Sequence, residues 1–294
     1  MKELFSTAIS LFKKNKQTWT LAILVYCLIM TIGLGITMIT GLGNLLLIIF
    51  VVCPFIFTFI KLSIKGVDNL PLDNKDIYLG YKDLSRSIFI TLRKFLAPTL
   101  LCLLGYIGVY FVLSFGYIYL FEIDLVQKIV DIAMKQEAIN TQEISAILLN
   151  NTELMQKLMC LNYMALGVMI ILLNVFLNKK IFSIIFFMCI NSTRINYDYI
   201  VSNKKELNKY KLTIYNITIS LFYIIGLTLA VLVNYLLNNI MDNAIFSYLV
   251  SSFIFLIISG MAIPFKYIAY THLFNQYFNH EVGKLLEEEI KYRQ

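Results

Sequence analysis

Two histidines are the first residues to consider for chemistry, because histidine is the commonest metal ligand and general base in proteins. His272 and His280 are the only histidines in the chain. Their spacing puts them about 80° apart around a helix, which is poor for sharing one metal ion, and no His-Glu-x-x-His pattern joins them. We therefore expect no metal site and no other cofactor.

Cysteine chemistry is not expected either. No two of the five cysteines have the Cys-x-x-Cys spacing of zinc or redox sites, and all five lie in apolar segments. We expect them to be small buried side chains; they are Cys27, Cys53, Cys102, Cys160 and Cys189. The Gly33-Leu34-Gly35 sequence lies inside an apolar run and is not a phosphate-binding loop. These observations favour a protein that is not an enzyme.

The composition indicates which elements must position these residues. Of 294 residues, 59% are hydrophobic and 15% are charged, whereas soluble domains average about 45–50% and about 25%. The apolar residues are concentrated in runs of about twenty or more, which is typical of membrane proteins with several spans. The composition excludes a soluble enzyme, a secreted disulfide scaffold and a disordered tail.

Charge-free runs predict the membrane-spanning helices. A helix needs about 20 apolar residues to cross a bilayer, and one charge at its centre costs roughly 2.5–3.5 kcal/mol. We predict an all-α fold in a single membrane domain, 1–294, with six spans at 19–39, 44–60, 95–121, 158–178, 212–241 and 243–265. Because these spans contain no ionisable residue, we do not expect a proton relay. Their asparagines are expected to bond between helices; they are Asn44, Asn162, Asn174, Asn216 and Asn234.

Lysine and arginine predict the orientation, because they are retained on the cytoplasmic side. With these spans, 22 of the 25 basic residues fall on one side, and only Lys128, Lys135 and Lys157 fall on the other. We expect a protein of the bacterial cell membrane with both termini in the cytoplasm. Attraction to anionic lipid headgroups then explains the net charge of +7. Nucleic acid is not an expected partner.

Four further segments are predicted to be helical outside the spans. Residues 2–14 are amphipathic and are expected to lie in the membrane interface. Residues 122–158 are expected to form an outer helical cap, which is either a passive cover or a lid that gates a ligand. The apolar run 181–190 is too short to cross and is interfacial, re-entrant or buried; we interpret it as a helix on the cytoplasmic side, lying against the bundle. Residues 282–290 form part of a cytoplasmic C-terminal helix.

Prolines and apolar residues near the cytoplasmic side complete the candidates. Pro54, Pro98 and Pro264 lie in the second, third and sixth spans, where we expect them to kink the helices. A partner protein is expected to contact two apolar groups among mixed charges; they are Ile77, Tyr78, Leu285, Leu286 and Ile290. The alternative is that these two segments pack on each other.

Several loose motifs carry a resemblance to a known family. They are Lys14-Asn15-Lys16 before Trp19, the Pro54 helix with Lys61–Gly66, Tyr81-Lys82-Asp83, Ile190-Asn191-Ser192, and Pro264 leading to Tyr270–Phe274. With them the chain resembles a family of bacterial membrane proteins of unassigned function, similar to the membrane domain of some glycerophosphodiester phosphodiesterases. The resemblance implies neither phosphodiesterase activity nor any catalytic residue, because no catalytic domain is fused here.

Three classes of function remain open. Because the sequence contains no recognisable catalytic or metal-binding motif, it favours a non-enzymatic accessory or scaffold component of a membrane complex. Six spans with both termini on one side also resemble the permease subunit of an ATP-driven exporter, which would need a separate ATPase as its partner. An enzyme that acts on lipid is the least favoured class, because the sequence offers no acid, base or metal group near the membrane surface.

Overall fold

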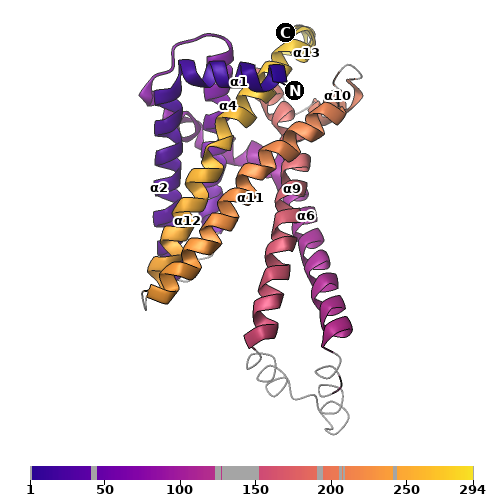
Figure 1. Ribbon diagram of the computed structural model, residues 1–294. Coiled ribbons are helices and arrows are strands. Elements are labelled where there is room, and N and C mark those ends of the chain that lie inside the picture. Colours follow the sequence, from indigo (N-terminus) through magenta and orange to yellow (C-terminus); the bar gives the residue numbers. More distant parts are fainter. Residues whose placement is uncertain are drawn as a thin grey trace. The chain divides into compact units, whose positions relative to one another are not determined.

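The predicted all-α fold with six spans is confirmed in the computed structural model (Figure 1). The described residues are 2–40, 45–122, 127, 152–190, 195–204, 207, 209–240 and 244–293. These residues form helices and no strand. Two compact units are described separately below: unit 1 is Met1–Pro98 with Leu173–Gln294, and unit 2 is Thr99–Leu172. The single membrane domain stays a prediction.

Five of the six candidate spans are longer than the charge-free runs that predict them, and the fifth is one residue shorter. They are Lys16–Met38, Ile48–Val67, Leu84–Phe121, Cys160–Ile190, Lys209–Leu237 and Ile245–Glu287. Each includes ionisable residues near one end, because the helices continue past the first charge. The helices therefore extend beyond the charge-free runs at their charged ends, and the predicted boundaries stay a prediction.

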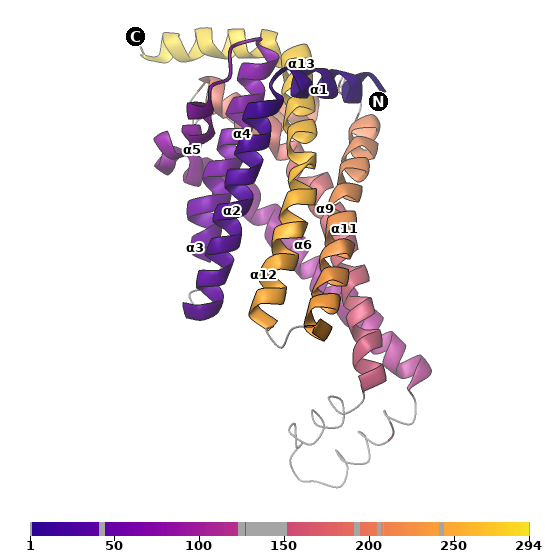
Figure 2. The same ribbon diagram turned by 60° about the vertical axis from the view of Figure 1, so that its left-hand side comes forward.

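The N-terminal helix α1, Lys2–Lys14, is amphipathic as predicted. Its apolar side packs on other helices of the chain: Ala8 is fully buried, and the rings of Phe12 and Phe265 lie 5.5 Å apart. Phe265 belongs to α13, Ala262–Arg293. Figure 2 shows α1 at the end of unit 1 toward which α13 runs. The apolar stripe of α1 is thus covered at least in part by α13.

Unit 1 has an aromatic core between α2 (Lys16–Thr40), α4 (Cys53–Val67) and α13. The ring of Phe59 stacks between Trp19, at 6.2 Å, and Tyr267, at 6.1 Å. Such pairs contribute about 0.5–1.5 kcal/mol each beyond the area that they bury. These contacts fix the three helices at one level of the bundle.

Two of the three prolines follow directly on an irregular point of a longer helical stretch, and the predicted kinks stay a prediction. Pro54 lies in the first turn of α4, directly after the π-helical segment Ile48–Val52. Pro264 lies in the first turn of α13, after α12 (Ala244–Gly260) has ended in a turn at Met261. Proline fits a first turn because it has no N–H to donate there. Only Pro98 lies inside a continuous helix, α6, Leu84–Phe121.

The segment between α4 and α6 packs along α4. It contains the short helices η2, Asn74–Tyr78, and α5, Leu79–Lys82. Lys65 pairs with Asp76 at 2.7 Å and Lys61 with Asp83 at 2.5 Å, so both ends of the segment are tied to α4. This segment is therefore part of the bundle and not a free surface loop.

Residues 181–190 do not form a separate helix. They are the last turns of α9, Thr152–Ile190, which continues through Lys179 and Lys180. Ile181, Phe182 and Phe186 are fully buried. Of the three placements left open, the run is therefore buried against the rest of unit 1, and the end of the fourth span at residue 178 stays a prediction.

Unit 2 contains parts of α6 and α9. The Tyr106 hydroxyl donates a hydrogen bond to Asn162, which joins the two helices. Large apolar side chains of this part of α6 are exposed, Leu101 and Val112 among them, as expected of a surface that faces lipid. The predicted outer cap, 122–158, lies almost wholly outside the described residues.

Candidate functional site

A lysine lies within the sixth candidate span. The sequence places Lys266 with the cytoplasmic bases, one residue after the predicted span 243–265. In the structure the span Ile245–Glu287 continues past it through α13. The charge-free span 243–265 stays a prediction, and Lys266 lies just past its end within the longer helix. Ionisable residues at membrane depth are costly, so each one is a candidate functional residue.

Lys266 borders a cavity of about 200 Å³ in unit 1. Tyr26 of α2, Tyr223 of α11 (Lys209–Ile240) and Tyr267 of α13 line the same cavity. The remaining wall is mostly phenylalanine and aliphatic side chains from α4, α12 and α13. An apolar cavity with a few converging polar groups is the usual form of a small-molecule site.

Two tyrosines that line the cavity stand well inside the lengths of candidate spans. Tyr26 stands about 15 Å along α2 from Lys16, at a rise of about 1.5 Å per residue. By the same rise, Tyr223 stands about 21 Å along α11 from Lys209. The hydrocarbon core of a bilayer is about 30 Å thick. Both tyrosines, and the cavity between them, therefore lie inside the apolar layer if these lysines mark its edge.

The Lys266 ammonium group has only neutral neighbours among the described residues. Its Nζ lies 3.4 Å from Oδ1 of Asn174 and 5.6 Å from the centre of the Tyr267 ring. No described carboxylate lies within ion-pair distance of it. The amide oxygen and the π-face stabilise the cation without cancelling its charge. A positive charge at the cavity wall is thus left for a ligand.

The break between α12 and α13 positions Lys266. The Met261 N–H is shared between the carbonyls of Ile257 and Ile258, at 3.1 and 3.2 Å, so the turn at Met261 keeps the helical bond to Ile257 and adds a tighter one. At Gly260 a Cβ atom would lie 2.7 Å from Cγ2 of Ile23, so glycine allows α12 to approach α2 closely. α13 then restarts at Ala262, and its second turn carries Lys266.

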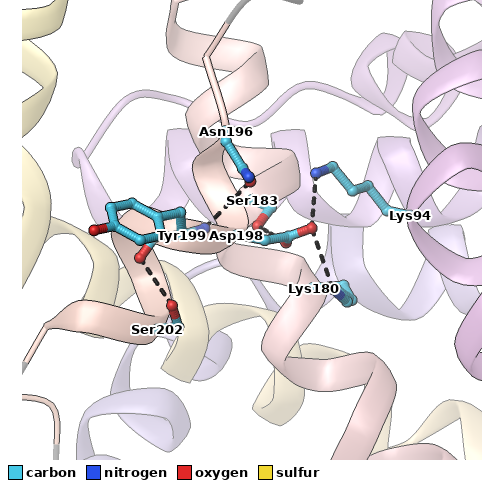
Figure 3. A network of polar contacts seen from close by, with 7 residues as sticks. All are labelled: Lys94, Lys180, Ser183, Asn196, Asp198, Tyr199 and Ser202. Carbon is cyan, nitrogen blue, oxygen red and sulfur yellow. Dashed lines mark hydrogen bonds and ion pairs between the residues drawn. The ribbon is translucent and has the colours of Figure 1, made fainter.

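A second polar centre surrounds Asp198 (Figure 3). Asp198 lies on α10, Tyr197–Asn203. Its Oδ1 accepts a hydrogen bond from Ser183 at 2.5 Å, and its Oδ2 lies 3.1 Å from Lys94 and 3.2 Å from Lys180. Burial raises the pKa of Asp198, but the Ser183 hydroxyl and the two ammonium groups outweigh it and hold this pKa below its usual value. The carboxylate therefore ties α6, α9 and α10 together.

The predicted role of the asparagines is confirmed for three of the four that the structure describes. Asn216 accepts hydrogen bonds at its Oδ1 from Asn178 and from Tyr270, both at 2.9 Å. Asn162 and Asn174 also bond to other helices, as described above. Asn44 lies outside the described residues. Asn234 forms no such bond: its Oδ1 is buried without a partner in the described part of the chain.

The proposed partner residues do not form one surface. Ile77 is 2% exposed, and Leu285 packs against the main core cluster. Tyr78 and Leu286 are exposed, at 51% and 38%. The side chain of Ile290 is not among those described. Two of these residues thus belong to the core, and only Tyr78 and Leu286 are available to a partner.

The remaining sequence candidates are distributed through the bundle. Within the described residues, no three His, Cys, Asp or Glu side chains are grouped as a metal site would need. Cys27, Cys53 and Cys102 are buried as predicted, whereas Cys160 and Cys189 are exposed, so the prediction is wrong for these two.

Comparison with family models, with curated proteins and with solved structures found no match in any of the three. The resemblance to the membrane domain of glycerophosphodiester phosphodiesterases therefore stays a prediction. The Lys266 cavity and the Asp198 network are therefore the features from which a function can be proposed.

Proposed function

We propose that this protein is a non-enzymatic membrane protein that binds the acidic group of a largely apolar ligand in the Lys266 cavity. The observation that carries the proposal is the uncancelled charge of Lys266 in a cavity lined by three tyrosines. Holding a charge at membrane depth is costly. A bound anion offsets that cost, because an ion pair is strong where water is excluded.

The lining of the cavity suits an anionic amphiphile such as a fatty acid. The ammonium of Lys266 would pair with the carboxylate, and tyrosine hydroxyls would donate hydrogen bonds to its oxygens. Phe55 and Phe59 supply apolar wall for the first part of the chain. A volume of about 200 Å³ holds the acid group and a few methylenes, so the rest of the chain would extend toward the bilayer.

The single tryptophan gives a direct test of binding. Trp19 stacks on Phe59, whose ring lines the cavity. Brominated decanoate bound in the cavity should quench Trp19 fluorescence of the purified protein in detergent, and the brominated alcohol of equal length should quench it much less. We expect Lys266→Met to weaken quenching by decanoate about tenfold or more, which corresponds to about 1.4 kcal/mol.

Two further variants separate charge from folding. Lys266→Arg keeps the charge and should retain most of the binding, whereas Lys284→Met removes an exposed lysine of the same helix and should change nothing. If Lys266→Met binds brominated decanoate as tightly as the unmodified protein, or if acid and alcohol quench equally, the proposed function is wrong.

We further propose that the protein lies in a bacterial cell membrane with both termini in the cytoplasm. The support is the placement of 22 of 25 basic residues on one side of the six spans. In a variant without native cysteines, Lys75→Cys and Ser145→Cys should react with a membrane-impermeant label from opposite sides. Labelling of both from the same side would contradict this topology.

A second candidate function is the permease subunit of an ATP-driven exporter. The break between α12 and α13 favours it, because a discontinuous helix beside a cavity gives a bundle a place to bend. A separate ATPase should then co-purify with the protein in mild detergent. If none does so from cells that express both at natural levels, the accessory role is the better one.

A further inference from the structure

A second cavity, of about 310 Å³, lies between the end of α9, α10 and the beginning of α11. Lys179, Lys180 and Lys209 line it together with Asp198. All of these residues belong to unit 1, and none of them borders the Lys266 cavity. This cavity is therefore a candidate site separate from the Lys266 cavity.

The charges around this cavity do not balance. Three ammonium groups line it against the single carboxylate of Asp198. That carboxylate is further engaged by Lys94, at 3.1 Å, from outside the cavity. Lys179 forms no ion pair or hydrogen bond with any other described residue. Lys209 uses one of its three N–H groups on the Ser202 carbonyl, at 2.8 Å, and keeps two. An anion would find at least two free donors here.

The opposite wall of the cavity is apolar. Phe182, Leu207 and Leu212 are buried side chains that line it. Phe176 lines it too and is 51% exposed, one turn before Lys179 on α9. A ligand bound to the lysines would thus continue onto an exposed aromatic ring. This combination suits a molecule with an anionic head and an apolar chain.

The position of the cavity along the spans indicates that this molecule is a membrane lipid. Lys209 is the first residue of the fifth candidate span, so the lysines lie where a bilayer places its headgroups. Basic pockets between membrane helices bind phosphate-containing headgroups. We propose that this cavity binds the phosphate of an anionic glycerophospholipid, with Lys179 and Lys209 contacting the phosphate and an acyl chain lying along Phe176.

Native mass spectrometry of the delipidated protein in detergent tests the proposal. We expect one phosphatidylglycerol to bind in clear preference to phosphatidylcholine. Lys179→Gln and Lys209→Gln should each lower the affinity for phosphatidylglycerol about fivefold, the fold-change that corresponds to about 1 kcal/mol per lysine near an anionic membrane surface. Lys179→Arg should retain binding, as should Lys284→Gln, which removes an exposed lysine elsewhere at the same end of unit 1.

Three results would overturn the assignment. Equal binding of phosphatidylglycerol and phosphatidylcholine would show that charge does not select the ligand. Unchanged binding in both glutamine variants would place the lipid elsewhere. Displacement of phosphatidylglycerol by inorganic phosphate at equal concentration would make free phosphate the ligand. Lys266→Met should leave lipid binding unchanged, so this proposal and the proposed function fail separately.

Discussion

Gly80 lies where α5 contacts α4, and replacing it with alanine gives a sharp test of how the segment between α4 and α6 packs. A Cβ atom at this position would lie 1.9 Å from the carbonyl oxygen of Pro54 and 2.8 Å from Oγ1 of Thr58. The Gly80 N–H already donates a hydrogen bond to that hydroxyl, at 2.8 Å. The added methyl group therefore has no room unless α5 moves away from α4.

The expected loss in free energy of unfolding follows from the contacts between α5 and α4 that this movement would break. Overpacking a core typically costs about 1–3 kcal/mol, and the upper end applies because the clash is with backbone, which cannot rotate away. The Gly80–Thr58 hydrogen bond would be lost as well, at about 1 kcal/mol. The edge-to-face contact of Tyr81 with Phe55, at 5.7 Å, would also weaken. We expect Gly80→Ala to lower the free energy of unfolding by about 3 kcal/mol or more.

Thermal unfolding in detergent, followed by Trp19 fluorescence, measures this effect. Gly283→Ala is the matched control: Gly283 lies in α13, and a Cβ there would meet no atom within 4 Å. Alanine should stabilise that exposed helical position by up to about 1 kcal/mol. If Gly80→Ala unfolds at the same temperature as the unmodified protein, α5 does not pack against α4 as described.

Three other changes test contacts in unit 1. Asp198→Asn should lower the free energy of unfolding at neutral pH, because it removes the partner of two lysines. The loss should be only about 1–2 kcal/mol, because this carboxylate is over a third exposed and water screens its ion pairs. Because the folded-state pKa of Asp198 is lowered, its contribution to stability is present above about pH 4 and is lost as pH falls through the folded pKa. The melting temperature of the variant should therefore fall less between neutral and acidic pH than that of the unmodified protein. Asn216→Ala should cost about 1–3 kcal/mol by leaving two buried donors without an acceptor, unlike Asn234→Ala, as thermal unfolding would show. Leu285→Lys should reduce the yield of folded protein on size-exclusion chromatography, whereas Leu286→Lys should not.

The sequence predicts the number of spans because insertion depends on local hydrophobicity. It does not predict where the spans end, because a charge near a helix end is tolerated when a distant residue pairs with it. Lys180 shows this: it follows an apolar run and reads as a boundary, yet α9 continues to Ile190 because Asp198 of the next helix pairs with Lys180. The acid lies eighteen residues away in sequence, so no local pattern reveals the pair.

The sequence does not reveal the level of Lys266 in the bundle, for a related reason. As the first base after an apolar run, it has the pattern of a residue at the membrane edge. Its level is set by packing: Phe59 faces Tyr267, and Ser63 bonds to Thr271 at 2.6 Å, which places the start of α13 beside the start of α4 and Lys266 near the middle of α4. Only the apolar run that continues through Tyr267, Ile268 and Ala269 would have indicated a longer span.

The two helix breaks explain why the cavity forms where it does. Val52 ends the π-helical segment before α4, and Gly260 ends α12 before α13; both residues line the Lys266 cavity. Pro54 and Pro264, each in the first turn of the following helix, remove an N–H that a continuous helix would bond. The sequence shows both prolines, but only the packing of α4 against α13 brings their two breaks to one cavity, and that cavity is where the charge of Lys266 lies.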